Sequence, residues 1–141
     1  MKNAVSGRVA RKLKYGWTLP EKIGPWSLSK FESELADYTA PLEIDHVQTT
    51  AKVRMRKMLF EYDIIVYPDY NNVGTVTARI KSFDSKGEAA DALVSLLESM
   101  ADKEKVVGVC EHIIDLFASG SATHYEDVDE FLNAFHLGEI K

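Results

Sequence analysis

The spacing of apolar residues changes along the chain and predicts helices in some segments and strands in others. Near the N-terminus, Val5, Val9 and Leu13 are four residues apart, which favours a short helix with a basic opposite face. A second helix is predicted over residues 28–38, where apolar residues recur at spacings of three and four and where Ser29 and Glu32 have the form of a capping box. Pro41 is predicted to end that helix.

Beyond this helix the apolar period shifts toward two, which predicts strands. A short strand is expected around residues 42–46, and residues 51–67 are the most strand-like part of the chain. Within 51–67 the apolar positions are odd-numbered at first and even-numbered later, so one flat strand would turn its core face outward. We therefore expect a bulge or a tight turn near residues 57–59. After a turn cluster at 68–74, a partner strand from Val76 completes a predicted β-hairpin.

The C-terminal half shows three amphipathic helical patterns. The first begins at a capping box formed by Ser85 and Glu88 and carries an apolar stripe as far as Met100. The second continues from Val106 to Phe117, and a flexible Ser-Gly-Ser joint at 119–121 follows. The third is predicted to begin at another capping box, Thr123 and Glu126. Helices that follow an antiparallel sheet in this way favour an α+β domain.

The predicted fold is thus an α+β, two-layer domain in which a small antiparallel sheet, centred on a hairpin and containing about three strands, packs against several helices. Residues 1–118 would form the core domain with a basic N-terminal arm. Residues 119–141 would form the flexible joint and an acidic amphipathic helix, which either belongs to the same domain or docks onto a partner.

Composition and charge limit the class of protein and the cellular compartment that the sequence fits. The chain has 141 residues, of which 45% are apolar and 28% charged, as in ordinary globular domains. Its single cysteine, Cys110, excludes an internal disulfide and fits a reducing compartment, and no apolar run reaches bilayer length, so a cytoplasmic protein is expected. Residues 1–60 carry eleven Lys or Arg against six Asp or Glu, and residues 61–141 carry six against sixteen. Opposite charges of the two halves allow them to pair within or between subunits.

No residue pattern predicts catalysis, a cofactor or a metal. The four histidines lack the spacing of zinc ligands, the glycines fit neither a P-loop nor a dinucleotide fingerprint, and Cys110 lies on an apolar helix stripe. The acidic residues at 126–130 lie at a predicted helix N-terminus, where the helix dipole favours negative charge. A small enzyme with a dispersed site remains an alternative, and Asp63, His46 and Tyr62 are its nearest polar cluster.

Two surfaces are candidates for binding. A basic strand face would carry five cations and could contact nucleic acid; its residues are Lys52, Arg54, Arg56, Arg79 and Lys81. The third C-terminal helix would present an apolar stripe to its own core, to a second subunit or to a partner's groove; its residues are Val128, Phe131, Leu132 and Phe135.

The leading hypothesis is a non-enzymatic binding or assembly module that acts through protein–protein contacts, most simply as a homo-oligomer, and that is encoded by a virus or a mobile element. A nucleic-acid-associated regulator that uses the basic strand face is the alternative. Neither a membrane nor a small-molecule substrate is indicated by the residues.

Overall fold

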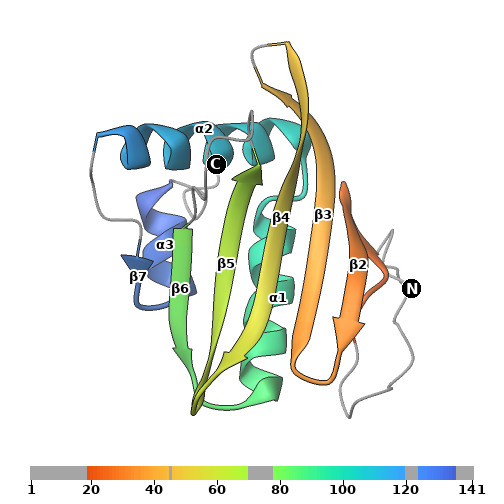
Figure 1. The fold of residues 1–141 in the computed structure, drawn as a ribbon, viewed down its shortest axis with the longest axis vertical. Helices are drawn as coiled ribbons and strands as arrows, with labels where there is room; N and C mark the ends of the chain where they lie inside the picture. The colour runs from red at the N-terminus through yellow and green to blue at the C-terminus, as the bar shows by residue number, and fades with distance from the viewer. Residues whose placement is uncertain (1–18, 45, 70–77, 120–123, 136–141) are drawn as a thin grey trace.

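A single sheet of seven strands organises the molecule. The computed structural model describes residues 19–44, 46–69, 78–119 and 124–135. Six strands follow one another as an antiparallel meander: β1 (Lys22–Ile23), β2 (Trp26–Glu32), β3 (Leu35–Ile44), β4 (Val47–Met58), β5 (Glu61–Asp69) and β6 (Ala78–Phe83). Helices α1 (Lys86–Ser99) and α2 (Lys103–Ala118) follow, then β7 (His124–Tyr125), which pairs parallel with β6, and finally α3 (Val128–Ala134) (Figure 1).

This sheet corrects the predicted fold class. The α+β class is right, but a small antiparallel sheet of about three strands is wrong, because seven strands form one mixed sheet in the order β1 to β7. The largest error is the helix predicted over residues 28–38, which is the β2–β3 hairpin.

A register shift in β2 explains why that hairpin has the spacing of a helix. Pairing between β2 and β3 shifts between Leu28 and Lys30, so that Leu28 and Phe31, three residues apart, both point into the core. After the turn, Ala36 and Tyr38 return to the same face. A bulge adds one residue to a period of two, and the resulting three-residue spacing is indistinguishable from one helical turn.

Pro41 lies inside β3 and does not end an element. It pairs with Thr50 of β4, whereas the pairing of β3 with β2 stops at Thr39. One side of β3 therefore has no neighbouring strand at Pro41, and a strand edge is where a proline is tolerated. The strand expected at 42–46 is the continuation of β3 as far as Ile44.

The parity change within residues 51–67 is a tight turn, as predicted. β4 ends at Met58, β5 begins at Glu61, and these two residues face each other. Leu59 and Phe60 form the turn between the strands. The predicted hairpin of β5 with the next strand is also confirmed by the antiparallel pairing of β5 and β6.

The capping box predicted for α1 is confirmed, but the one predicted for α3 is wrong. The Ser85 side chain accepts a hydrogen bond from the backbone N–H of Glu88 and caps α1. The cap of α3 is Asp127 rather than Thr123, because Tyr125 belongs to β7 and pairs with Ile80. The Asp127 side chain accepts the N–H of Glu130, and Thr123 lies outside the described residues, as does the helix predicted from Val5 to Leu13.

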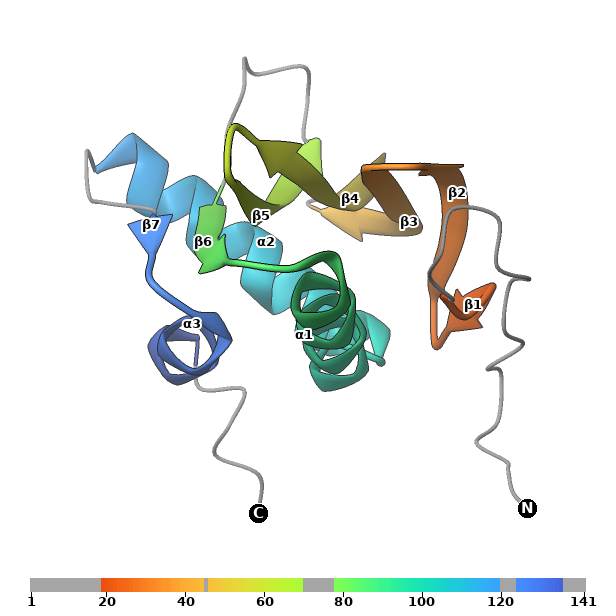
Figure 2. The same ribbon diagram turned by 90° about the horizontal axis from the view of Figure 1, so that it is seen from below.

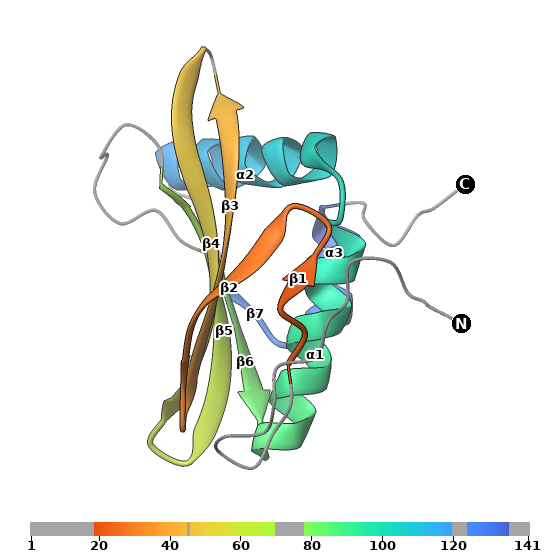
Figure 3. The ribbon, with the colours of Figure 1, turned by 90° about the vertical axis from the view of Figure 1, so that its right-hand side faces the viewer.

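The core lies between the sheet and the helices. Figure 2 and Figure 3 show α1 and α3 on one side of the sheet, and α2 crosses one end of it. Alternate residues of each strand are buried beneath the helices; on the central strands they are Ala36, Tyr38, Ala51, Val53, Met55, Ile64, Val66 and Ile80. Their helical partners include Leu93, Leu96, Leu97, Val106 and Ile113.

The β1–β2 hairpin is locked onto the junction between α1 and α2. The indole Nε1 of the fully buried Trp26 donates to the Met100 carbonyl at 3.0 Å. Gly24 has a φ of +54°, and a Cβ added there would lie 2.4 Å from the Ala101 carbonyl oxygen. Only glycine fits this close approach. None of the helices in the described segments is long and apolar enough to cross a membrane.

Candidate functional site

The face of the sheet opposite the helices carries the five cations predicted from the sequence. Alternation along the strands places Lys52, Arg54 and Arg56 of β4 on this face, beside Arg79 and Lys81 of β6. No described helix or strand covers it (Figure 3). The structure thus brings the predicted basic residues together on one surface, which is called the open face here.

Three of the five cations are engaged with two buried aspartates. Arg54 donates Nε and Nη2 to the two carboxylate oxygens of Asp37, at 2.8 and 3.0 Å. Asp63 accepts from Arg56 Nε at 3.0 Å and from Arg79 Nε at 2.6 Å. The hydrogen bonds to Asp37 raise the pKa of the Arg54 guanidinium, against the opposing effect of burial. The open face is therefore an internal ion-pair network rather than a row of free cations.

This network reduces the charge that the open face offers to a nucleic acid. The two aspartates are almost completely buried, whereas the side chains of the three arginines are 25–32% exposed. Lys52 lies over the Tyr67 ring, 5.9 Å from its centroid. A phosphate would have to compete with a carboxylate that is already in place for each arginine, so nucleic-acid binding stays an untested prediction with weaker support than the sequence indicated.

The polar cluster considered for a dispersed enzyme site is not assembled. Asp63 points to the open face, its strand neighbour Tyr62 is buried toward the helices, and His46 is exposed in the β3–β4 turn. These side chains occupy opposite faces of the sheet and one of its ends. Among the described residues, no group of three or more His, Cys, Asp or Glu side chains could hold a metal ion.

Cys110 is a core residue, as its position on the apolar helix stripe predicted. Its side chain lies in the cluster between α2 and the sheet. Burial raises the pKa of its thiol to about 12, so the nucleophilic thiolate is essentially absent at neutral pH.

The apolar stripe of α3 lies against the protein's own core. Phe131 is fully buried and stacks on Phe135 with ring centroids 4.4 Å apart. Tyr125 of β7 contacts both rings edge-on, and Val128 and Leu132 pack partly buried beside them. A partner could bury the whole stripe, Phe131 included, only if α3 left this position.

Leu59 and Phe60, at the turn between β4 and β5, form the most exposed large apolar surface of the described chain. They are 86% and 89% exposed, and Met58 beside them is 37% exposed. Leu59 also has a φ of 54°, a conformation that two-residue turns normally assign to Gly, Asn or Asp. These three residues, Met58 to Phe60, are called the hairpin tip.

Sequence reasoning located this turn but missed its importance. The signal was available, because three consecutive large apolar residues stood where the strand pattern demanded a turn. Turns normally carry polar residues or glycine. The alternation of the following strand instead assigns Phe60 to that strand.

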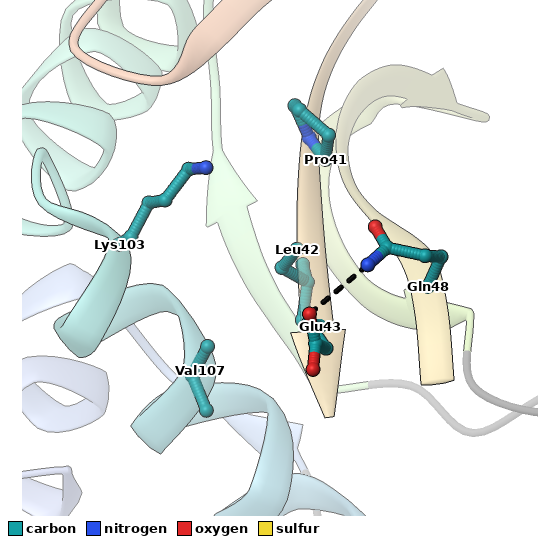
Figure 4. Close-up of a pocket in the computed structure, with 6 residues that line it drawn as sticks. All are labelled: Pro41, Leu42, Glu43, Gln48, Lys103 and Val107. Carbon is teal, nitrogen blue, oxygen red and sulfur yellow. Dashed lines mark hydrogen bonds between the residues drawn. The ribbon is translucent and has the colours of Figure 1, made fainter. Parts of the chain in front are cut away.

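A pocket lies at the opposite end of the same sheet. It has a volume of about 300 Å³ and lies between the end of β3 and the first turns of α2; it is lined by Pro41, Leu42, Glu43, Gln48, Lys103 and Val107. Figure 4 shows the Lys103 side chain pointing toward β3, while Gln48 Nε2 donates to Glu43 Oε1 at 3.0 Å. Apolar surface from Pro41, Leu42 and Val107 thus meets a charged rim.

No protein-family model, no curated protein and no solved structure matches this chain.

Proposed function

We propose that this protein is a non-enzymatic binding module that attaches to another protein through the hairpin tip. The observation that carries the proposal is the exposure of Leu59 and Phe60 at a turn that holds Leu59 at a φ of 54°. A left-handed backbone conformation costs a side-chain-bearing residue about 1–2 kcal/mol. The fold recovers nothing for this cost, because neither side chain packs on the core.

The hairpin presents these side chains on a firm support. β4 and β5 pair without a break from Thr50 opposite Asp69 to Met58 opposite Glu61. Near the tip, Lys57 Nζ lies 3.4 Å from Glu34 Oε2 of the β2–β3 turn. An anchor that is rigid before binding loses little conformational entropy in the complex.

The size of the tip is suited to an anchor rather than to a whole interface. Burial of a leucine and a phenylalanine side chain contributes about 1.5–3 kcal/mol each. That is a substantial part of the energy of a moderate complex, but association also has to offset the loss of translational and rotational freedom. The partner therefore has to surround the tip. Aromatic residues at the centres of protein interfaces are enclosed by pockets in the same way.

The single cysteine fits a reducing compartment, so we place this function in the cytoplasm. Assembly with its own copies is the simplest form of the proposal.

The test replaces the tip with residues that suit the turn. The double variant Leu59→Asn, Phe60→Gly places asparagine, which tolerates a left-handed backbone, at the position whose φ is 54° and removes both large apolar side chains, so we expect it to fold as stably as the parent. We expect the parent to gain mass with concentration in sedimentation velocity and the variant to remain monomeric. The proposal is refuted if the tip variant, with both proteins folded, self-associates as strongly as the parent and binds the same partner proteins.

A further inference from the structure

The hairpin tip and the pocket lie at opposite ends of one sheet. The tip closes the β4–β5 hairpin, and the pocket lies beside the turn of the β3–β4 hairpin, where Gln48 faces Glu43. The two hairpins close at opposite ends of the sheet (Figure 1). Met58 follows Gln48 by ten positions in β4, which is a span of about 34 Å at the rise of an antiparallel strand. The tip of a molecule therefore cannot occupy its own pocket.

The pocket has the size and the lining that the tip requires. A cavity of about 150 Å³ with apolar walls accommodates benzene, so a volume of about 300 Å³ holds a phenyl ring with room for neighbouring atoms. Pro41, Leu42 and Val107 supply apolar wall, and Leu42 is buried while Val107 is half-buried.

The two surfaces also carry one pair of opposite charges, and the Glu43 carboxylate on the same rim accepts a hydrogen bond from Gln48 Nε2. Glu61 follows Phe60 directly and is exposed at the tip, and the exposed Lys103 stands on the rim of the pocket. Neither side chain has an ion-pair partner in the described parts of the chain. A contact between the two surfaces would let the Glu61 carboxylate pair with the Lys103 ammonium group.

From the size of the pocket, its lining and this charge complementarity, we infer that the pocket receives the hairpin tip of a second copy of this chain. The inference rests on the proposed function and names the partner of the same tip. Because the two surfaces differ, the contact is head-to-tail, and each added copy leaves one tip and one pocket unoccupied. Such contacts produce open chains, or a ring where the rotation between copies closes.

The experiment uses one variant of each surface. Leu59→Asn, Phe60→Gly removes the tip, and Val107→Arg fills the pocket with a long charged side chain. Each variant alone should be monomeric in sedimentation velocity, with association at least about ten- to a hundredfold weaker than in the parent. An equimolar mixture should form a one-to-one heterodimer that does not grow, because it contains only one intact tip and one intact pocket.

A charge exchange covers the case in which Val107→Arg disturbs the fold. Lys103→Glu should weaken association, and Glu61→Lys in the same chain should restore it, because the pair is reversed but complementary. Lys105→Glu is the matched control and should leave association unchanged, because Lys105 lies two residues beyond Lys103 in α2 and does not line the pocket.

Other results overturn the inference in distinguishable ways. Self-association of the pocket variant at the parent's strength would show that the tip binds elsewhere, for example to another tip, and would leave the proposed function standing. A mixture that stays monomeric, or a Lys103→Glu effect that Glu61→Lys does not reverse, would also reject the head-to-tail contact. A parent that is monomeric at every concentration would reject self-assembly and leave only a foreign partner for the tip.

Discussion

Removal of the negative charge from Asp63 tests the ion-pair network of the open face. Asp63→Asn keeps the shape of the side chain but leaves Arg56 and Arg79 without the carboxylate to which they donate at 3.0 and 2.6 Å. Loss of one partner from a buried ion pair costs about 3–5 kcal/mol. The arginine side chains are about one-third exposed, so water compensates part of this loss, and we expect a cost of about 2–3 kcal/mol.

Urea denaturation of the parent and the variant, monitored by circular dichroism, measures this difference in the free energy of unfolding. In thermal unfolding, the same difference should lower the melting temperature by roughly 6–9 °C for a domain of this size. Glu34→Gln is the matched control. Its partner Lys57 follows Arg56 on β4, but both side chains of the Lys57–Glu34 pair are about half exposed, so we expect a cost of at most about 0.5 kcal/mol. In a double-mutant cycle with Arg79→Gln, the coupling energy should exceed about 1 kcal/mol.

The reasoning fails if Asp63→Asn destabilises no more than Glu34→Gln, or if Asp63 and Arg79 show no coupling. In that case the arginines would be held by packing on the sheet, and the carboxylate would contribute nothing to the stability of the open face. The arginines would then be free to contact a phosphate.

Two further predictions concern the turn that locks β1–β2 and the charge of the open face. Gly24→Ala should destabilise the fold by about 2–4 kcal/mol, because its methyl group meets the Ala101 carbonyl at a backbone conformation that alanine disfavours. Gly108→Ala, where an added Cβ meets nothing within 4 Å, should stabilise it by about 0.5–1 kcal/mol, and equal effects on thermal unfolding would contradict this account. If a single-stranded oligonucleotide binds the open face, only Lys52 and Lys81 should contact phosphates, and the plot of log affinity against log salt should have a slope of about −1.4. A slope near −3.5, as expected for five contacts, would show that the arginines leave their aspartates.

The features that the sequence determined by itself are those set by neighbouring residues. The cap at Ser85 and the apolar stripes of α1 and α2 lie within a few residues of the backbone that they stabilise, so their pattern was sufficient. The turn at Leu59 and Phe60 followed from the change in parity between Met55 and Ile64, since a core face cannot switch sides within a flat strand.

Other features depended on residues far apart in the chain. The register shift in β2 that imitates a helical period was decided by pairing with β3, and the start of α3 was moved to Asp127 because Tyr125 pairs with Ile80 of β6. The meeting of Asp37 with Arg54, seventeen positions later, converted a basic ladder into a network of ion pairs. Strand pairing and ion pairing act through space, and a one-dimensional pattern records only the residues that take part. The hairpin tip could be recognised only from the sequence and the tertiary structure together. Its apolar residues stand in the sequence, but only the folded sheet shows that no other described residue covers them.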